Sequence, residues 1–140
     1  KVTPRDEAAA PFTEKYCIME APKDREPEYV FLHELAEDGE GNTFAAVINE
    51  KTGFGIRLDF NRKNLPYFME WKSLASGDYV VGLEPANSSV YGRAYHEENG
   101  NLHTIKPFAR ENNRLVITIL EEEELVRTEE EAQALAGKKE

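Results

Sequence analysis

The chain has 140 residues, enough for one domain, and 40% of them are hydrophobic, which permits a folded core and argues against general disorder. Its 27 acidic residues against 17 basic ones give a net charge of −10, which disfavours nucleic acid and anionic membrane surfaces as partners. A single cysteine, Cys17, excludes an internal disulfide and a cysteine-rich zinc site, and we predict a cytoplasmic protein with no cofactor and no membrane span.

Residues 1–28 show no sustained hydrophobic period, and we predict an extended arm or loop there. Four prolines interrupt this segment: Pro4, Pro11, Pro22 and Pro27. The chain begins at Lys1 rather than at a methionine. We expect that a segment has been trimmed from it, or that it is the carboxy-terminal part of a longer polypeptide.

Most of the chain after residue 28 is typical of β-strands. Residues 29–35 and 43–49 are short runs rich in branched and aromatic side chains, and 50–53 ends on glycine like a hairpin loop. Residues 54–60 alternate strictly between apolar and small or polar side chains. We therefore predict that 43–49 and 54–60 form an antiparallel hairpin with one shared buried face, formed by Phe54, Ile56, Leu58 and Phe60.

Further strands are predicted at 67–72, 79–84, 91–95, 102–107 and 114–120, separated for the most part by clusters of turn-forming residues. Seven or eight short strands predict an all-β fold, an antiparallel β-sandwich over 29–122 or a barrel. Residues 123–140 form an acidic tail that is partly helical. Its helix is expected from Thr128, which Glu131 follows at capping-box spacing.

Glu84 ends the strand 79–84 and should face away from Val81 and Leu83. We expect Pro85 to stop the sheet pairing directly after it. A carboxylate beside apolar neighbours at the end of a strand is suited to general-base catalysis. Alternatively, it is a solvated residue with no such role.

Trp71, the only tryptophan, offers a flat apolar face to a sugar ring, and Lys72 offers a donor to its hydroxyl groups. The alternative is that Trp71 anchors the core. Arg93, between Tyr91 and Tyr95, either binds an anionic or hydroxylated ligand or pairs with a surface acid.

The histidines, His33, His96 and His103, are not spaced as metal ligands, so we interpret each as a surface or capping residue and predict no metal site. The chain contains neither a glycine-rich phosphate loop nor a serine nucleophile elbow.

The order of several motifs resembles the carboxy-terminal part of the aldose 1-epimerase (galactose mutarotase-like) superfamily, and most of all its bacterial branch described as a domain of unknown function. The resemblance covers roughly residues 26–120. Its most specific part is the string Tyr79-Val-Val-Gly-Leu-Glu84-Pro85, followed by Gly92-Arg93. Leu65-Pro66-Tyr67, Trp71-Lys72, Asn49 before its hairpin and the Gly100-Asn101-Leu102 turn also belong to it.

The resemblance implies that the β-sandwich is part of a supersandwich with a sugar site on a concave sheet face. It also implies that Glu84 is the general base that converts one anomer of an aldose into the other, together with a histidine acid. None of the three histidines matches that acid, which would precede Lys1. Glu28 is the nearest equivalent of a further acidic residue that binds the sugar.

We therefore expect Glu84, Trp71, Lys72 and Arg93 to meet on one concave face, with Asn87 at its rim. We also expect the chain to leave a sheet edge or an apolar face exposed, to be completed by an amino-terminal segment or another chain, for example in a dimer. The main hypothesis is an epimerase-like enzyme or its carboxy-terminal part. The alternatives are a non-catalytic carbohydrate-binding sandwich and an interaction module that uses its sheet edges.

Overall fold

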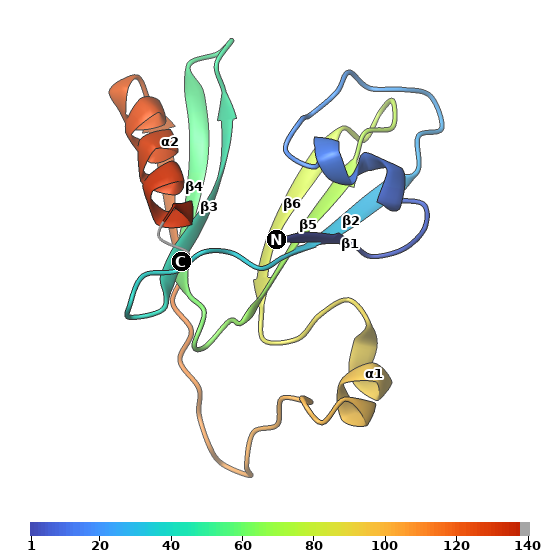
Figure 1. The fold of residues 1–140 in the computed structure, drawn as a ribbon, viewed down its shortest axis with the longest axis vertical. Coiled ribbons are helices and arrows are strands. Elements are labelled where there is room, and N and C mark those ends of the chain that lie inside the picture. Colours follow the sequence, from blue (N-terminus) through green and yellow to red (C-terminus); the bar gives the residue numbers. More distant parts are fainter. Residues whose placement is uncertain (138–140) are drawn as a thin grey trace. The chain divides into compact units, whose positions relative to one another are not determined.

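A computed structural model describes residues 1–137 (Figure 1). The chain divides into two compact units, where length alone led us to expect one domain. Unit 1 comprises residues 1–34 and 67–104, and unit 2 comprises 35–66 and the chain from 105 onward. The chain therefore passes from unit 1 to unit 2 after residue 34, returns to unit 1 after residue 66 and enters unit 2 again after residue 104.

Unit 1 contains a four-stranded antiparallel sheet with the strand order β1-β2-β5-β6. Its elements are β1 (Val2–Pro4), the 3₁₀ helix η1 (Ala10–Lys15), β2 (Glu28–His33), β5 (Tyr67–Ser73), β6 (Val80–Ala86) and the helix α1 (Gly92–Glu98). Three of the predicted strands, 29–35, 67–72 and 79–84, are confirmed here to within two residues.

The two faces of this sheet differ in composition because neighbouring residues of a strand point to opposite sides. Register places Trp71 opposite Gly82 and Met69 opposite Glu84, so these four side-chain positions share one face, which we call the Trp71 face. The other face carries Lys72 and Phe31 and is called the Lys72 face. Its core is formed by Ala9, Tyr29 and Phe31, with Val2, Phe12 and Tyr16 packed against them.

The amino-terminal segment is more ordered than the predicted arm. β1 pairs antiparallel with β2, with Thr3 opposite Leu32. The ring of Phe12, in η1, lies 4.3 Å from that of Tyr29. Burial of these apolar side chains on the Lys72 face provides a stabilisation that the local sequence pattern does not reveal.

Unit 2 contains a three-stranded antiparallel sheet of β3 (Asn42–Asn49), β4 (Phe54–Asn61) and β7 (Val116–Glu121), in that order. The predicted β3–β4 hairpin is confirmed. Its turn is closed by a 3.0 Å hydrogen bond from the backbone N–H of Gly53 to the carbonyl of Asn49. Gly53 has a φ of +70°, a conformation that glycine adopts without strain.

Helix α2 (Glu123–Ala136) lies along this hairpin (Figure 1). The guanidinium of Arg57 forms an ion pair with Glu131 of α2 and another with Asp59, and it also stacks on Phe44. The helix begins at Glu123, five residues before the predicted start, because acidic residues in a first turn interact favourably with the helix dipole. Residues 138–140 of the predicted tail lie outside the described residues.

The opposite face of the unit 2 sheet is apolar and largely uncovered. Register aligns Ile56 with Ile119 and Leu58 with Ile117, and Phe54 lies on the same side. We call this surface the Ile56 face. Leu58 and Phe60 are buried as predicted, but Phe54 and Ile56 are 52% and 46% exposed, and Ile117 and Ile119 are 69% and 57% exposed.

Two predicted strands are wrong. Residues 91–95 belong largely to α1, where Tyr91 and Tyr95 are one helical turn apart with ring centroids at 4.8 Å. Residues 102–107 contain no strand. Pro85 also does not end the sheet pairing, since Pro85 lies opposite Phe68 and Ala86 opposite Tyr67. An edge strand such as β6 tolerates proline because every second N–H points away from its partner strand.

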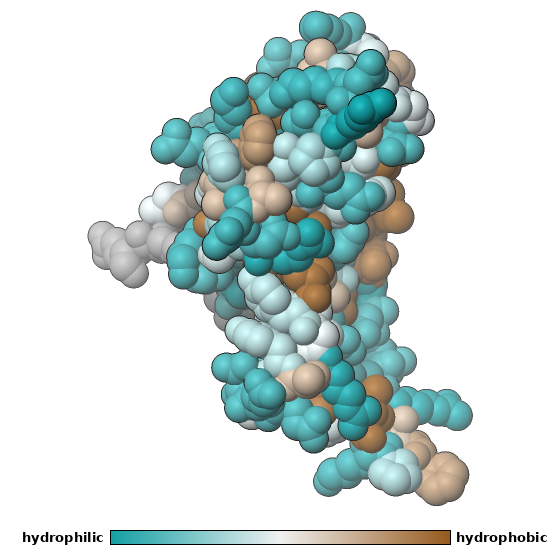
Figure 2. Space-filling model, turned by 90° about the vertical axis from the view of Figure 1, so that its right-hand side faces the viewer, coloured by the Kyte–Doolittle hydropathy of each residue, from teal (hydrophilic) through white to brown (hydrophobic). Residues whose placement is uncertain are grey.

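The fold is therefore mostly β, with two antiparallel sheets and a few helices. Figure 2 shows one side of the chain, where hydrophilic residues predominate, in keeping with the acidic composition. Within residues 1–137, no helix is both long and apolar enough to cross a membrane.

Candidate functional site

Trp71 and Glu84 lie on the same face of neighbouring strands, as predicted from their order in the chain. Trp71 is half-buried in β5, and Glu84 is exposed in β6. Trp71 lies opposite Gly82, and Glu84 belongs to the next residue pair whose side chains point to the same face. Val81 and Leu83, as expected, point to the opposite face, because they alternate with Glu84. The Trp71 face thus presents an aromatic ring and a carboxylate side by side.

Gly82 occupies the position between these two side chains. A Cβ atom built on Gly82 would lie 2.7 Å from Oε1 of Glu84 and 3.3 Å from Cε3 of Trp71. The carboxylate of Glu84 therefore folds back over Gly82 toward the edge of the indole ring. Gly82 is not among the predicted site residues, although a glycine inside a strand is a signal of close approach by another group.

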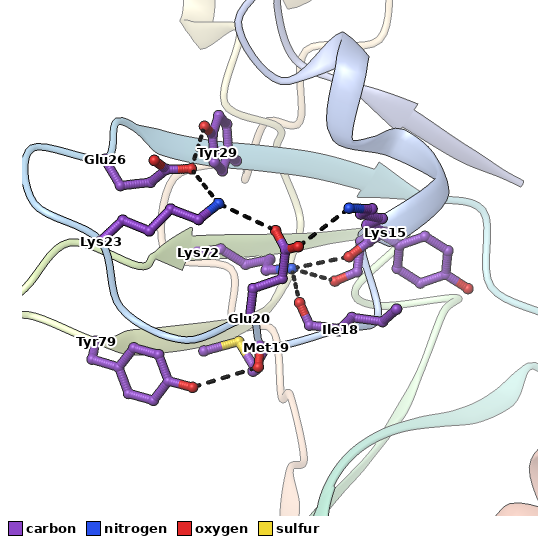
Figure 3. A network of polar contacts seen from close by, with 10 residues as sticks. Lys15, Ile18, Met19, Glu20, Lys23, Glu26, Tyr29, Lys72 and Tyr79 are labelled. Atoms are coloured by element: carbon purple, nitrogen blue, oxygen red, sulfur yellow. Dashed lines mark hydrogen bonds and ion pairs between the residues drawn. The ribbon is translucent and has the colours of Figure 1, made fainter.

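Lys72 is not part of this arrangement, and our expectation that it converges with Trp71 and Glu84 is wrong. Because it follows Trp71 directly in β5, its side chain points to the opposite face, where it is only 3% exposed. Its Nζ donates hydrogen bonds to three backbone carbonyls, those of Lys15 at 3.2 Å, Tyr16 at 2.8 Å and Ile18 at 2.7 Å (Figure 3). All three donors are used to hold the segment that follows η1.

A chain of polar contacts extends this attachment on the Lys72 face (Figure 3). Glu20 pairs with Lys15 at 3.2 Å and with Lys23 at 3.6 Å, and Lys23 in turn pairs with Glu26. The hydroxyl of Tyr29 donates to Glu26 at 3.0 Å. Burial raises the pKa of Tyr29 to about 12, with a further contribution from Glu26, whereas burial lowers the pKa of Lys72.

The remaining predicted ligands lie at different distances from Glu84. Glu28 begins β2 opposite Ser73, so it shares the Trp71 face, but it lies four residue pairs from Glu84 along the ladder, about 13 Å. Asn87 follows the last residue of β6 and is half-buried. Arg93 is not on a sheet strand as predicted but is exposed on α1.

His96 attaches α1 to the end of the Trp71 face. It is 1% exposed, and its ring meets that of Tyr67 edge-on at 5.3 Å. The backbone N–H of Ser89 donates to Nε2 at 3.1 Å, so Nε2 carries a lone pair and Nδ1 donates to Oδ1 of Asn101 at 2.8 Å. His96 is therefore an interior residue that joins α1 to Ser89, Asn101 and Tyr67, and the prediction of a surface or capping residue is wrong.

The other two histidines are outside this site. His33 lies on the Lys72 face, where Nε2 is 3.0 Å from Oε2 of Glu70, so it forms an interior hydrogen bond rather than the predicted surface or cap contact. His103 is exposed. Among residues 1–137, no group of three or more His, Cys, Asp or Glu side chains is arranged to hold a metal ion.

Residues 1–119 match the family model of a domain of unknown function, DUF4432. The chain belongs to the DUF4432 family. This match confirms the resemblance, predicted from the motif order around Glu84, to a branch described as a domain of unknown function. A search of curated proteins gave no match for this DUF4432 chain.

Among solved structures, the DUF4432 chain is similar to one described as a "putative aldose 1-epimerase" from Klebsiella pneumoniae subsp. pneumoniae MGH 78578. The TM-score is 0.91 at 22% sequence identity, and the match covers 99% of this chain and 37% of that chain. At this identity the likeness shows the fold. The DUF4432 chain therefore has the architecture of part of that fold and spans little more than a third of its length.

Proposed function

We propose that this chain forms the sugar-binding part of an aldose 1-epimerase-like enzyme, with Glu84 as its general base. The observation that carries the proposal is the Trp71 face, where an aromatic ring and a carboxylate lie on neighbouring strands with no side chain between them. A pyranose has an apolar ring face that stacks on an aromatic side chain and rim hydroxyls that bind a carboxylate. The fold likeness supports the same conclusion independently of these residues.

In this proposal Glu84 takes the proton of the anomeric hydroxyl, and the C1–O bond to the ring oxygen breaks as C1 becomes an aldehyde carbon. A general acid gives a proton to the departing ring oxygen. Rotation about the C1–C2 bond and the reverse steps then close the ring as the other anomer, and both protons return to their donors. The reaction consumes nothing but requires two groups on opposite sides of one acetal.

The general acid is assigned to polypeptide outside this chain. No described strand position of the Trp71 face carries a histidine. His33 is paired with Glu70 on the opposite face, and both ring nitrogens of His96 are engaged in hydrogen bonds. The lack of a histidine on the described strand positions of the Trp71 face also favours a second candidate, a non-catalytic carbohydrate-binding module. Such a module needs the aromatic ring and the carboxylate but no general acid.

Asn87 and Arg93 are proposed as rim contacts for the sugar. Both lie in the segment before His96, which is joined to Ser89 by a hydrogen bond and contacts the ring of Tyr67. Tyr67 lies opposite Ala86, two residues beyond Glu84 in β6. Glu28 lies too far along the ladder to contact the same pyranose ring as Glu84. It is therefore proposed as a contact only for a sugar longer than one ring.

The Ile56 face is proposed to be covered by further polypeptide of the same fold, in an amino-terminal segment or in another chain such as a second copy. Four apolar side chains on this face are about half exposed or more. Contiguous exposed apolar surface of this kind is typical of an interface. The proposal places the protein in the cytoplasm, where the exposed free thiol of Cys17 stays reduced.

Polarimetry on a freshly dissolved aldose tests the catalytic proposal in a polypeptide that carries the rest of the fold. Glu84→Gln should lower the rate of anomer interconversion by about 10²-fold while the fold is retained. Glu121→Gln is the matched control, since Glu121 is likewise an exposed glutamate on an edge strand but belongs to the other sheet. Equal rates for Glu84→Gln and wild type would remove Glu84 from catalysis. Sugar binding without any interconversion would favour the binding module.

A further inference from the structure

Gly82 lies where a glycine is not required by the backbone. It is an interior residue of β6, its φ is outside the left-handed region, and its neighbours pair regularly with β5. Glycine weakens a strand because it gains less from packing and loses more conformational freedom on folding than other residues. The reason for a glycine here must therefore be the space above it.

That space is occupied by the carboxylate of Glu84. Oε1 of Glu84 lies 2.7 Å and Cδ 3.5 Å from the place of a Cβ atom on Gly82, and the ring of Trp71 borders the same place at 3.3 Å. A separation of 2.7 Å is too short for a carbon–oxygen contact, so a methyl group at this position would displace the carboxylate. Glu84 can move because it is exposed and flexible, whereas the half-buried ring has less freedom.

We propose that Gly82 is a positioning residue that keeps the carboxylate of Glu84 flat against the sheet at the edge of the Trp71 ring. This inference rests on the proposed function, because it assigns to Gly82 the geometry that the base needs. A sugar stacked on Trp71 presents its rim hydroxyls at the edge of the ring, where Gly82 allows the carboxylate to lie. A side chain at position 82 would lift the carboxylate off the sheet and out of line with that rim.

The first test needs no sugar. Trp71 is the only tryptophan, so the tryptophan fluorescence of the chain reports on its surroundings alone. Because the carboxylate of Glu84 lies at the edge of the ring, the emission of the wild type should differ from that of Glu84→Gln. Gly82→Ala should reduce the change in emission that Glu84→Gln causes, whereas Gly39→Ala should not, because no atom lies within 4 Å of a Cβ at Gly39. An equally large change in the Gly82→Ala background would overturn the inference.

The second test uses the polypeptide that interconverts anomers. Gly82→Ala should lower kcat by about 10- to 100-fold with a smaller change in KM, as expected for a displaced catalytic group. Gly82→Ser is a second variant in case one of them folds poorly, which circular dichroism and thermal melting would show. Wild-type kcat in a folded Gly82→Ala or Gly82→Ser variant would refute the positioning role.

The two failures are distinguishable. If Glu84→Gln lowers the rate and the Gly82 variants do not, the proposed function stands and the inference about Gly82 is wrong. If no aldose binds or is interconverted, the proposed function fails, and the positioning role in catalysis fails with it. The comparison of Trp71 emission with and without Glu84→Gln then still decides whether Gly82 sets the place of the carboxylate.

Discussion

Replacement of Lys72 by methionine should destabilise unit 1 rather than weaken sugar binding. Methionine preserves most of the length of the side chain but removes the three donors that hold the carbonyls of Lys15, Tyr16 and Ile18. Each hydrogen bond from a charged donor contributes about 1.5–3 kcal/mol, and leaving a buried acceptor without a partner costs about 1–3 kcal/mol.

The net effect is smaller than the sum of these contributions. Burial of the amine is itself unfavourable, as the lowered pKa of Lys72 indicates, and methionine removes that cost. The carbonyls belong to a segment that can reach water when it is released. We therefore expect Lys72→Met to lower the free energy of unfolding by about 2–4 kcal/mol.

Urea denaturation followed by circular dichroism measures this loss, and limited proteolysis locates it. Cleavage within residues 15–20 should be faster in Lys72→Met, because these residues lose their attachment to β5. Lys63→Met, an exposed lysine in unit 2, is the control. Unchanged stability combined with weaker sugar binding would contradict the structural role and restore Lys72 as a ligand.

Three further predictions concern other parts of the chain. Because the pKa of Tyr29 is raised in the folded state, the tyrosine of the unfolded state ionises first above pH 10. The free energy of unfolding should therefore fall by about 2–3 kcal/mol between pH 10 and 12. Urea denaturation of Tyr29→Phe should show a smaller fall over the same range. His96→Ala should accelerate proteolysis between residues 87 and 101, because His96 bonds to Ser89 and Asn101; an unchanged rate would contradict this attachment. Ile117→Ser should reduce self-association or the binding of a hydrophobic dye, with little change in the free energy of unfolding, because the side chain is 69% exposed. A large loss of stability would instead show that the Ile56 face is already covered.

Local patterns were sufficient for the pairing that builds the candidate site. A strand, a short turn-rich connection and a second strand predict an antiparallel pair, and this brings Trp71 next to Gly82 and Glu84. Alternation along a strand also decides which side chains share a face. It rules out the predicted convergence of Lys72 with Trp71, because adjacent residues of a strand point in opposite directions.

The errors arose where contacts distant in the sequence decide the structure. Tyr91 and Tyr95 favour a strand by composition, but the buried hydrogen bonds of His96 stabilise a helix instead. The amino-terminal strand depends on pairing with β2, some thirty residues later in the chain, as in Val2 opposite His33. Burial of Phe54 and Ile56 was predicted from alternation, which identifies an apolar face but not whether anything covers it.

Titration of Trp71 fluorescence with free aldoses is the most direct test of the central claim, because the single tryptophan lies beside the proposed base. We predict a saturable change in emission for the wild type, and weaker binding or a different change for Glu84→Gln, with Glu121→Gln behaving as the wild type. Calorimetric sugar binding that leaves the emission of Trp71 unchanged, or no binding of any aldose, would contradict a sugar site on the Trp71 face.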